Sequence, residues 1–178
     1  MKQSRLSMYT VNLKYIRNLT KVDDNVLSIS PQKGKANRPF VGIIVICDNK
    51  QYCVPFSSPK DKHRSMKNDV DFSKVFDADG KLVAVLNFNN MIPVRADVID
   101  RLDISIHPDD TPATKRYKAL LLDQLTFCRQ NQDAIVTKAN KLYNLITKGK
   151  PSGLLKRRCC NYEKLEEVLA KFTLFSEK

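Results

Sequence analysis

Two serines, a proline and a lysine follow one another at 57–60, and a histidine, His63, comes three residues later. Hydroxyl groups and cations donate hydrogen bonds to phosphate oxygens, and histidine transfers protons near neutral pH. RNA carries its own nucleophile, because its 2′-hydroxyl can attack the adjacent phosphate when a base, an acid and cations are supplied. The loop therefore has the groups that metal-free RNA cleavage requires. Its simpler interpretation is a capped helix with a solvated basic face.

The roles within this loop stay open at the level of the sequence. Lys60 could act as an acid if its pKa were lowered, while Ser57 and Ser58 could bind phosphate oxygens or relay a proton. His63 is the first choice for acid–base work by its pKa alone. Cations flank it on both sides, however, and a helix beginning at Pro59 would turn it away from the serines.

A hairpin must carry this loop. The apolar, β-branched run Phe40–Cys47 predicts a central strand, residues 48–50 form a tight turn, and Gln51–Phe56 returns as the partner strand. An antiparallel pair brings its two outer ends together. We therefore expect Arg38, in the basic loop before the first strand, to lie beside Lys60 and the serine pair.

The remaining patterns predict a single α+β domain over residues 1–178, with a twisted antiparallel sheet packed against several helices and a helical hairpin in the C-terminal half. Alternation predicts further strands at Met8–Val11, Asp71–Phe76, Lys81–Phe88 and Met91–Val94. Helices are expected after Asn12, from Thr111-Pro112, from Asn131 or Asp133, and after Asn161, with a basic loop over Lys148–Arg158. The state of Ala96–Ile106 stays undecided, and Asn89-Asn90 either bend the chain or present amides to a base.

The positive charge is segregated along the chain. The net charge is +12, with +6 in residues 31–67 and +8 in residues 111–178, against −5 in the segment between them. This pattern favours a polyanionic partner, although a ribosome or a membrane surface would also explain it. The residues expected to bind RNA are Lys33, Lys35, Lys62, His63, Arg64, Lys67, Lys115, Arg116, Lys118, Lys148, Lys150, Lys156 and Arg157.

Several other classes of protein find little support. The five cysteines are odd in number and form no Cys-x-x-Cys pair, and neither His63 nor His107 stands at ligand spacing, so we expect no disulfide framework, no metal site and no cofactor. Cys159-Cys160 adjoin three cations that could lower their pKa, but no partner histidine follows. Without an 18-residue apolar run or a signal segment, the chain is expected to be cytoplasmic and to bind no membrane.

Four segments, taken in order, resemble those of a known family. They are Lys14-Tyr15-Ile16, the run 38–43 that reads Arg-Pro-Phe-Val-Gly-Ile, the run 55–60 with Lys62-His63 after it, and the run 87–94 that reads Asn-Phe-Asn-Asn-Met-Ile-Pro-Val. Together they resemble the ToxN/AbiQ endoribonuclease toxins of type III toxin–antitoxin systems, which act in abortive infection. The resemblance covers most of the chain and implies a strongly twisted antiparallel sheet with helices.

The resemblance also implies an activity and partners. It implies metal-independent RNA cleavage at adenine-rich sites, and inhibition by a repeat antitoxin RNA, folded as pseudoknots, that the toxin itself cuts from a precursor. Ser58 matches the essential serine, with Ser57 and Lys60 beside it, and Arg38 matches the basic residue before the strand, with Lys35 as its rival. Cellular or phage RNA would be the substrate, and toxin–RNA pairs could close into rings. The alternative is a non-catalytic RNA-binding protein.

Overall fold

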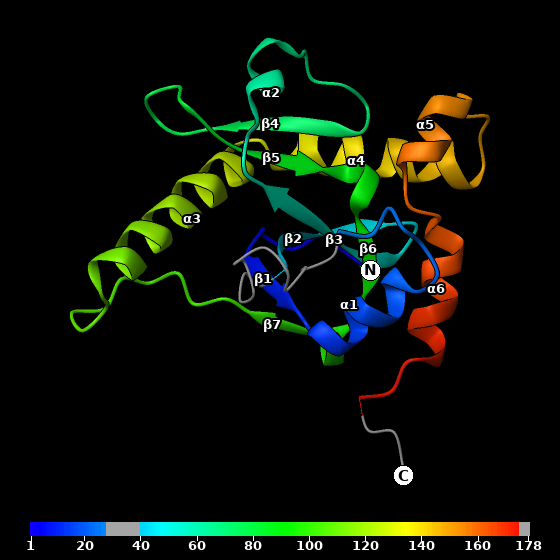
Figure 1. Cartoon of the computed structure of the whole chain (residues 1–178), viewed down its shortest axis with the longest axis horizontal. Coiled ribbons are helices and arrows are strands. Elements are labelled where there is room, and N and C mark those ends of the chain that lie inside the picture. Colours follow the sequence, from blue (N-terminus) through cyan, green and yellow to red (C-terminus); the bar gives the residue numbers. More distant parts are fainter. Residues whose placement is uncertain (28–39, 175–178) are drawn as a thin grey trace.

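A computed structural model describes residues 1–27 and 40–174 and shows one open antiparallel sheet of seven strands (Figure 1). Six strands run in the order β4-β5-β3-β2-β1-β7, and β6 pairs with β3 beside this path. This arrangement confirms the predicted fold class. The strand bounds are β1 Met8–Val11, β2 Phe40–Cys47, β3 Lys50–Ser57, β4 Phe72–Phe76, β5 Leu82–Asn87, β6 Ile92–Val94 and β7 Ile99–Arg101.

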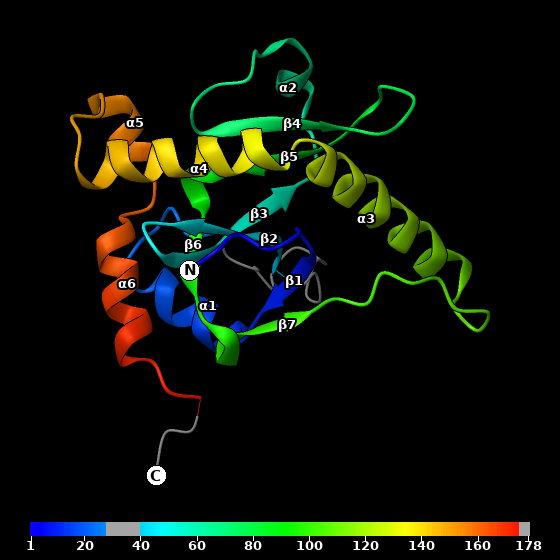
Figure 2. The ribbon, with the colours of Figure 1, turned by 180° about the vertical axis from the view of Figure 1, so that it is seen from behind.

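Helices pack on the sheet and around its rim. The two longest, α3 and α4, lie on the face that Figure 2 turns to the reader, while α1 and α6 lie beside β6. Among the described residues, no helix has the length and apolarity needed to cross a membrane. The helix bounds are α1 Leu13–Thr20, α2 Asp61–Ser65, α3 Pro112–Gln130, α4 Gln132–Thr147, α5 Gly153–Arg158 and α6 Tyr162–Lys171.

The β2–β3 hairpin matches the prediction and delivers the candidate loop. Asp48 and Asn49 both have positive φ, as a two-residue turn between twisted strands requires. Gly42 faces Pro55 across the hairpin, and a Cβ added there would collide with the carbonyl of Val54. A glycine is needed at position 42 because β2 and β3 approach too closely there for any side chain. This close approach is at Pro55, two residues before the serine pair.

The predicted caps are largely confirmed, and they fix where helices begin. The side chains of Asn12, Thr111 and Asn161 each accept a hydrogen bond from a backbone N–H in the first turn of α1, α3 and α6. The undecided segment 96–106 contains a short 3-10 turn followed by β7. The start of α2 differs from the prediction, because the helix begins at Asp61 and not at Pro59.

The C-terminal half differs from the prediction in two details. The expected helical hairpin is a bent pair: α3 and α4 diverge from Asn131, the single residue between them, and each packs against the sheet (Figures 1 and 2). One residue is too short a link for two helices to fold back on each other. The expected basic loop 148–158 contains helix α5, whose first turn is capped by Ser152.

Candidate active site

Ser57 ends β3 with its hydroxyl group already engaged on one side. Its backbone pairs with Val85 of β5, and its Oγ accepts a hydrogen bond of 2.9 Å from Nδ2 of Asn87 at the end of that strand. Because the amide nitrogen is the donor, the hydroxyl hydrogen of Ser57 is left to be donated elsewhere. The pairing therefore orients Ser57 as a hydrogen-bond donor, such as a phosphate oxygen would need.

Asn87 contacts the candidate loop, although the sequence patterns did not single it out. It opens the fourth matching segment, but it stands thirty residues from Ser57 and looks like an ordinary strand end. Only the β3–β5 pairing brings its amide to Ser57. A polar residue at the last position of a strand that neighbours the loop is the one signal that could have found it.

Ser58 and Lys60 are exposed next to Ser57. Lys60 is the residue before α2, and its backbone makes two hydrogen bonds with His63. The carbonyl of Lys60 accepts from the backbone N–H of His63 at 2.8 Å, and the N–H of Lys60 donates to Nδ1 of the His63 ring at 2.9 Å. The second bond is the half of a capping box in which the N3 side chain reaches back to the N-cap N–H, with a histidine in the usual place of Glu or Gln. The ring of His63 thus fixes the backbone that carries the Lys60 ammonium.

His63 is a buried residue and not part of the exposed basic surface, which corrects its expected contact with RNA. Its side chain is 8% exposed and packs against the ring of Phe72, with 6.2 Å between ring centroids. Burial, followed by the positive charges of Lys62, Lys60 and Lys74, lowers the pKa of His63 below its ordinary value. A neutral ring is what Nδ1 needs to accept the Lys60 hydrogen bond.

Three of the predicted site residues cannot be placed. Arg38 was the expected cation opposite the serines, with Lys35 as its rival and Lys33 as a further RNA contact. All three lie outside the described residues. Strand β2 begins at Phe40, which pairs with Val11 of β1.

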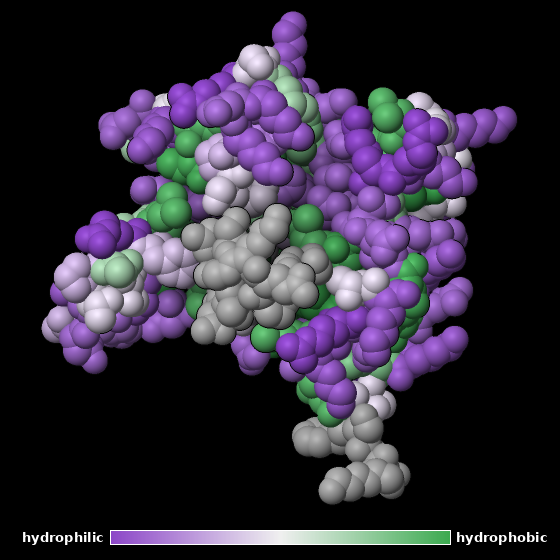
Figure 3. Space-filling view, viewed as in Figure 1, coloured by the Kyte–Doolittle hydropathy of each residue, from purple (hydrophilic) through white to green (hydrophobic). Residues whose placement is uncertain are grey.

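Helices α2 and α5 lie on the side of the molecule that carries β4 and β5, with α2 above β4 and α5 beside α4 (Figure 1). An ion-pair network connects α5 to the segment between α2 and β4. Arg158, the last residue of α5, donates to Asp71 at 2.6 Å and approaches Asp69 at 3.4 Å, and both aspartates lie in that segment. Figure 3 shows hydrophilic side chains over this side, as over most of the visible face. The exposed cations of α2, α5 and their flanking residues are Lys60, Lys62, Arg64, Lys67, Lys150, Lys156 and Arg157. Lys148 pairs instead with Asp48 in the β2–β3 turn, at the end of β3 opposite Ser57.

The three predicted cations of α3 are placed elsewhere. Lys115 and Arg116 stand near the start of α3, at the tip away from α2 in both ribbon views (Figures 1 and 2). Lys118 is committed to the fold, because its ammonium binds both carboxylate oxygens of Asp110, at 2.8 and 3.1 Å, and the carbonyl of Ser105. Its side chain is only 14% exposed, so this cation is not offered to RNA.

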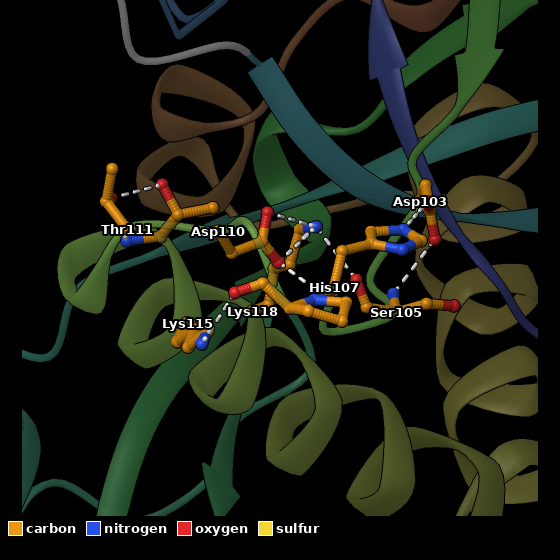
Figure 4. A network of polar contacts seen from close by, with 9 residues as sticks. Asp103, Ser105, His107, Asp110, Thr111, Lys115 and Lys118 are labelled. Carbon is orange, nitrogen blue, oxygen red and sulfur yellow. Dashed lines mark hydrogen bonds and ion pairs between the residues drawn. The ribbon is translucent and has the colours of Figure 1, made fainter.

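The same network explains the second histidine. In Figure 4, Nε2 of His107 meets Oδ2 of Asp103 at 2.9 Å, and the backbone N–H of His107 donates to Asp110. The hydrogen bond from His107 is the largest cause of the strongly lowered pKa of Asp103. His107 therefore shapes the loop that enters α3 and has a structural role.

Other candidates prove to be structural as well. All five cysteines are buried, and burial raises the pKa of Cys159 to about 12, which removes the possible low-pKa thiol. Tyr15 is fully buried and donates its hydroxyl hydrogen to the carbonyl of Pro93 at 2.7 Å. The amides of Asn89 and Asn90 donate to backbone carbonyls, so this pair bends the chain and does not present amides to a base.

Comparison with known proteins agrees with this architecture. Residues 7–170 match the family model described as toxin ToxN of the type III toxin–antitoxin system. The chain is 35% identical over 163 residues to the endoribonuclease ToxN of Bacillus thuringiensis subsp. kurstaki, covering 89% of this chain and 80% of that protein. It is 31% identical over 170 residues to the endoribonuclease ToxN of Pectobacterium atrosepticum, covering 94% of each.

Solved structures give the same result. One, reported as a toxin inhibited by a non-coding RNA pseudoknot, is 32% identical with a TM-score of 0.76, and the match covers 94% of this chain and 98% of that one. Another, the lactococcal anti-phage endoribonuclease AbiQ, has a TM-score of 0.78 over 94% and 98% of the two chains; at 19% identity it supports the fold alone. The sheet, the loop after its central hairpin and the match over residues 7–170 place this chain in the ToxN family of type III toxin–antitoxin toxins.

Proposed function

We propose that this chain is an endoribonuclease toxin that cleaves RNA at the loop 57–60 and is held inactive by an antitoxin RNA. Family membership and the two curated relatives, both named endoribonuclease ToxN, support the activity. The RNA pseudoknot in a related solved structure supports the partner. The observation that carries the assignment to this loop is the oriented Ser57 hydroxyl beside the exposed Ser58 and Lys60, at the edge of a basic surface.

The proposed reaction uses the nucleophile of the RNA itself. A base removes the proton of the 2′-hydroxyl, the bond from the 2′-oxygen to phosphorus forms, the bond to the 5′-oxygen breaks, and that oxygen receives a proton. The products are a 2′,3′-cyclic phosphate and a free 5′-hydroxyl, and the step consumes no water. Ser57 donates to a non-bridging oxygen, where negative charge develops, while Ser58 and Lys60 handle the protons. We place Arg38 on the phosphate, with Lys35 as the alternative.

The finer features of the proposal concern the need for a metal, the RNA that is cleaved and the assembly with the antitoxin RNA. The protein's cations stabilise the developing charge, so we propose that cleavage proceeds without a metal ion or other cofactor. We also propose that the protein acts in the cytoplasm, on cellular or phage RNA. Preference for adenine-rich sites and processing of the repeat precursor are proposed from the family resemblance. Closure of toxin–RNA pairs into rings is proposed because head-to-tail contacts can close. The rival function, an RNA-binding protein without catalysis, would use the same basic surface.

The test is the substitution Ser58→Ala, with Ser65→Ala on α2 as a matched control. Ser65 is an exposed serine whose hydroxyl donates only to the carbonyl of Lys62, at 3.3 Å. We expect Ser58→Ala to slow cleavage of a radiolabelled RNA at least about 100-fold, as loss of a general acid–base group or oxyanion donor does. RNA affinity and the Ser65→Ala rate should stay near those of the unaltered protein.

Three results would contradict the proposal. Full cleavage by Ser58→Ala would refute the assignment of the loop. Intact RNA after incubation with the unaltered protein, with and without a chelator, would favour the non-catalytic binder. Cleavage that EDTA abolishes and added magnesium restores would refute the metal-independent mechanism, and products ending in a 3′-hydroxyl would refute attack by the 2′-oxygen.

A further inference from the structure

A hollow of about 170 Å³ adjoins the candidate active loop. It opens between the segment that enters α2 and the start of β5, the same strand that pairs with Ser57 and supplies Asn87. It is smaller than the roughly 300–1,000 Å³ typical of sites for whole cofactors and suits a single flat ring. Its walls are Pro59, Lys60, Asp61, Arg64, Lys81 and Leu82.

The chemistry of this hollow is that of a nucleotide site. Pro59 and Leu82 are half-buried and give it an apolar surface, while the three cations outnumber the single carboxylate, Asp61. Among the described residues, neither Lys60 nor Lys81 forms an ion pair. A ligand that presents a flat apolar ring together with a negative charge matches these walls, and RNA presents both in every nucleotide.

Arg64 is the wall residue best able to bind a base. Its guanidinium approaches Asp61 at 3.8 Å, but the two side chains are 81% and 103% exposed, so water competes strongly for this pair. Arg64 is therefore available to an incoming ligand. A guanidinium plane stacks on the face of an unpaired base, as aromatic rings do in other single-strand RNA sites, and the walls of this hollow contain no aromatic ring.

We propose that this hollow is a subsite for one unpaired base, that of the nucleotide next to the phosphate that is cleaved; the inference rests on the proposed function. Lys60 belongs both to the hollow and to the candidate catalytic loop, so a base held here sets which phosphate meets the serines. Arg64 stacks on the base, Pro59 and Leu82 contact its apolar face, and Lys81 binds the attached phosphate. Arg64 and Lys81 thus become positioning residues for the reaction.

The test is a binding cycle between Arg64 and single bases of the RNA. The probes are short single-stranded oligoribonucleotides that contain the cleaved sequence, with a 2′-deoxy sugar at the scissile position and an abasic unit at one position in turn. We expect one abasic position to weaken binding to the unaltered protein about tenfold, the effect of losing one stacked base. In Arg64→Ala that same position should matter less than about twofold. Lys81→Ala should weaken every oligonucleotide alike, whereas Lys141→Ala, an exposed lysine of α4, should weaken none.

The outcomes separate the subsite from the proposed function. If each abasic unit weakens binding to the Arg64→Ala variant by the same factor as binding to the unaltered protein, Arg64 does not stack on a base. The hollow would then bind only phosphate, and the subsite would be refuted. Binding does not depend on cleavage in this assay, because the deoxy sugar removes the nucleophile. If the abasic effect is reduced in Arg64→Ala but the unaltered protein does not cleave the matching all-ribose oligonucleotide, the subsite is supported and the proposed endoribonuclease activity is refuted.

Discussion

At the scale of single residues, His63 holds Lys60 through a ring nitrogen that must carry no proton. Protonation of Nδ1 would turn this acceptor into a donor facing the Lys60 N–H, and the hydrogen bond of 2.9 Å would be lost. The positive charges that face the ring come from Lys60 and Lys62 and, from β4, Lys74. The burial and the nearby cations that lower the pKa of His63 therefore keep Nδ1 unprotonated, so that it can accept the hydrogen bond that holds the loop.

This arrangement predicts a loss of stability and activity in mild acid. The pKa of His63 is lower in the folded protein than its ordinary value of 6.5, so between these two values the unfolded chain binds more protons. Stability is thus fully present above about pH 6.5 and falls as the pH drops towards the folded-state pKa. Denaturation and single-turnover cleavage, measured from pH 5 to 8, should both show this decline.

Two variants identify the source of the decline. His63→Asn places an amide oxygen near the position of Nδ1, keeps the hydrogen bond and has no proton to gain, so its acid decline should be smaller. His63→Ala leaves the Lys60 N–H without its partner and should cost about 1–3 kcal/mol of stability at pH 7.5. An unchanged acid decline in His63→Asn would assign the titration to another group.

The sequence predicts the serines and Lys60 as site residues, but it does not predict the contacts of the residues around them. A histidine between cations looks like an exposed proton carrier, and only the capping geometry at α2 shows why it is buried. Asn87 looks like the end of a strand until β5 pairs with β3. Both roles depend on contacts between residues that hydrophobic patterning does not pair, and patterning reports which face is buried but not which polar atom meets which.

At the scale of elements, Glu166 of α6 joins the central hairpin to two helices. Its carboxylate accepts hydrogen bonds from the hydroxyls of Tyr52 on β3 and Tyr143 on α4, at 2.5 and 2.9 Å, and pairs with the ammonium of Lys50. Tyr52 is fully buried, so its hydroxyl hydrogen has no water to replace the carboxylate. Hydrogen bonds to a charged acceptor are roughly twice as strong as neutral ones.

Removing this carboxylate should loosen the elements without touching the site. We expect Glu166→Ala to lower the free energy of unfolding by about 2–3 kcal/mol, because a buried tyrosine hydroxyl loses a charged acceptor. Glu166→Gln should cost less, since its amide oxygen still accepts. Urea denaturation measures both, and the neighbouring, exposed Glu167→Ala serves as the control. A loss for Glu167→Ala equal to that for Glu166→Ala would show that α6 charge, not this junction, matters.

Patterning predicted the elements better than their packing. Six of the seven strands and the caps of α1, α3 and α6 follow from alternation, turn residues and N-cap side chains. The bent α3–α4 pair does not, because the lone Asn131 ends one helix and begins the next, and the sheet decides where each packs. Helix α5 was not predicted because three of its six residues are consecutive cations. With only Leu154 and Leu155 apolar, the segment has no helical period in its hydrophobic residues.

At the scale of the whole molecule, the fold determines where the cationic segments lie, whereas the sequence gives only their net charge. The loop 57–60 leads directly into α2, and α5 lies on the same side of the molecule, whereas the start of α3 lies at a distant tip (Figure 1). Net charge alone would assign RNA equally to both. The fold therefore predicts that the two groups contribute differently to binding.

Salt dependence measures that difference. Each phosphate contact on single-stranded RNA contributes about 0.7 to the slope of log K against log salt. We expect Lys62→Ala with Lys67→Ala to reduce the slope by about 1.4, because both side chains are exposed at the α2 end. The matched pair Lys115→Ala with Arg116→Ala should leave the slope unchanged within about 0.3, since RNA at the loop does not reach the α3 tip. Filter binding of one single-stranded RNA between 50 and 300 mM salt supplies the slopes. Equal reductions for the two pairs would mean that RNA binds along both ends of the molecule, and that the basic surface is not confined to the loop and its neighbours.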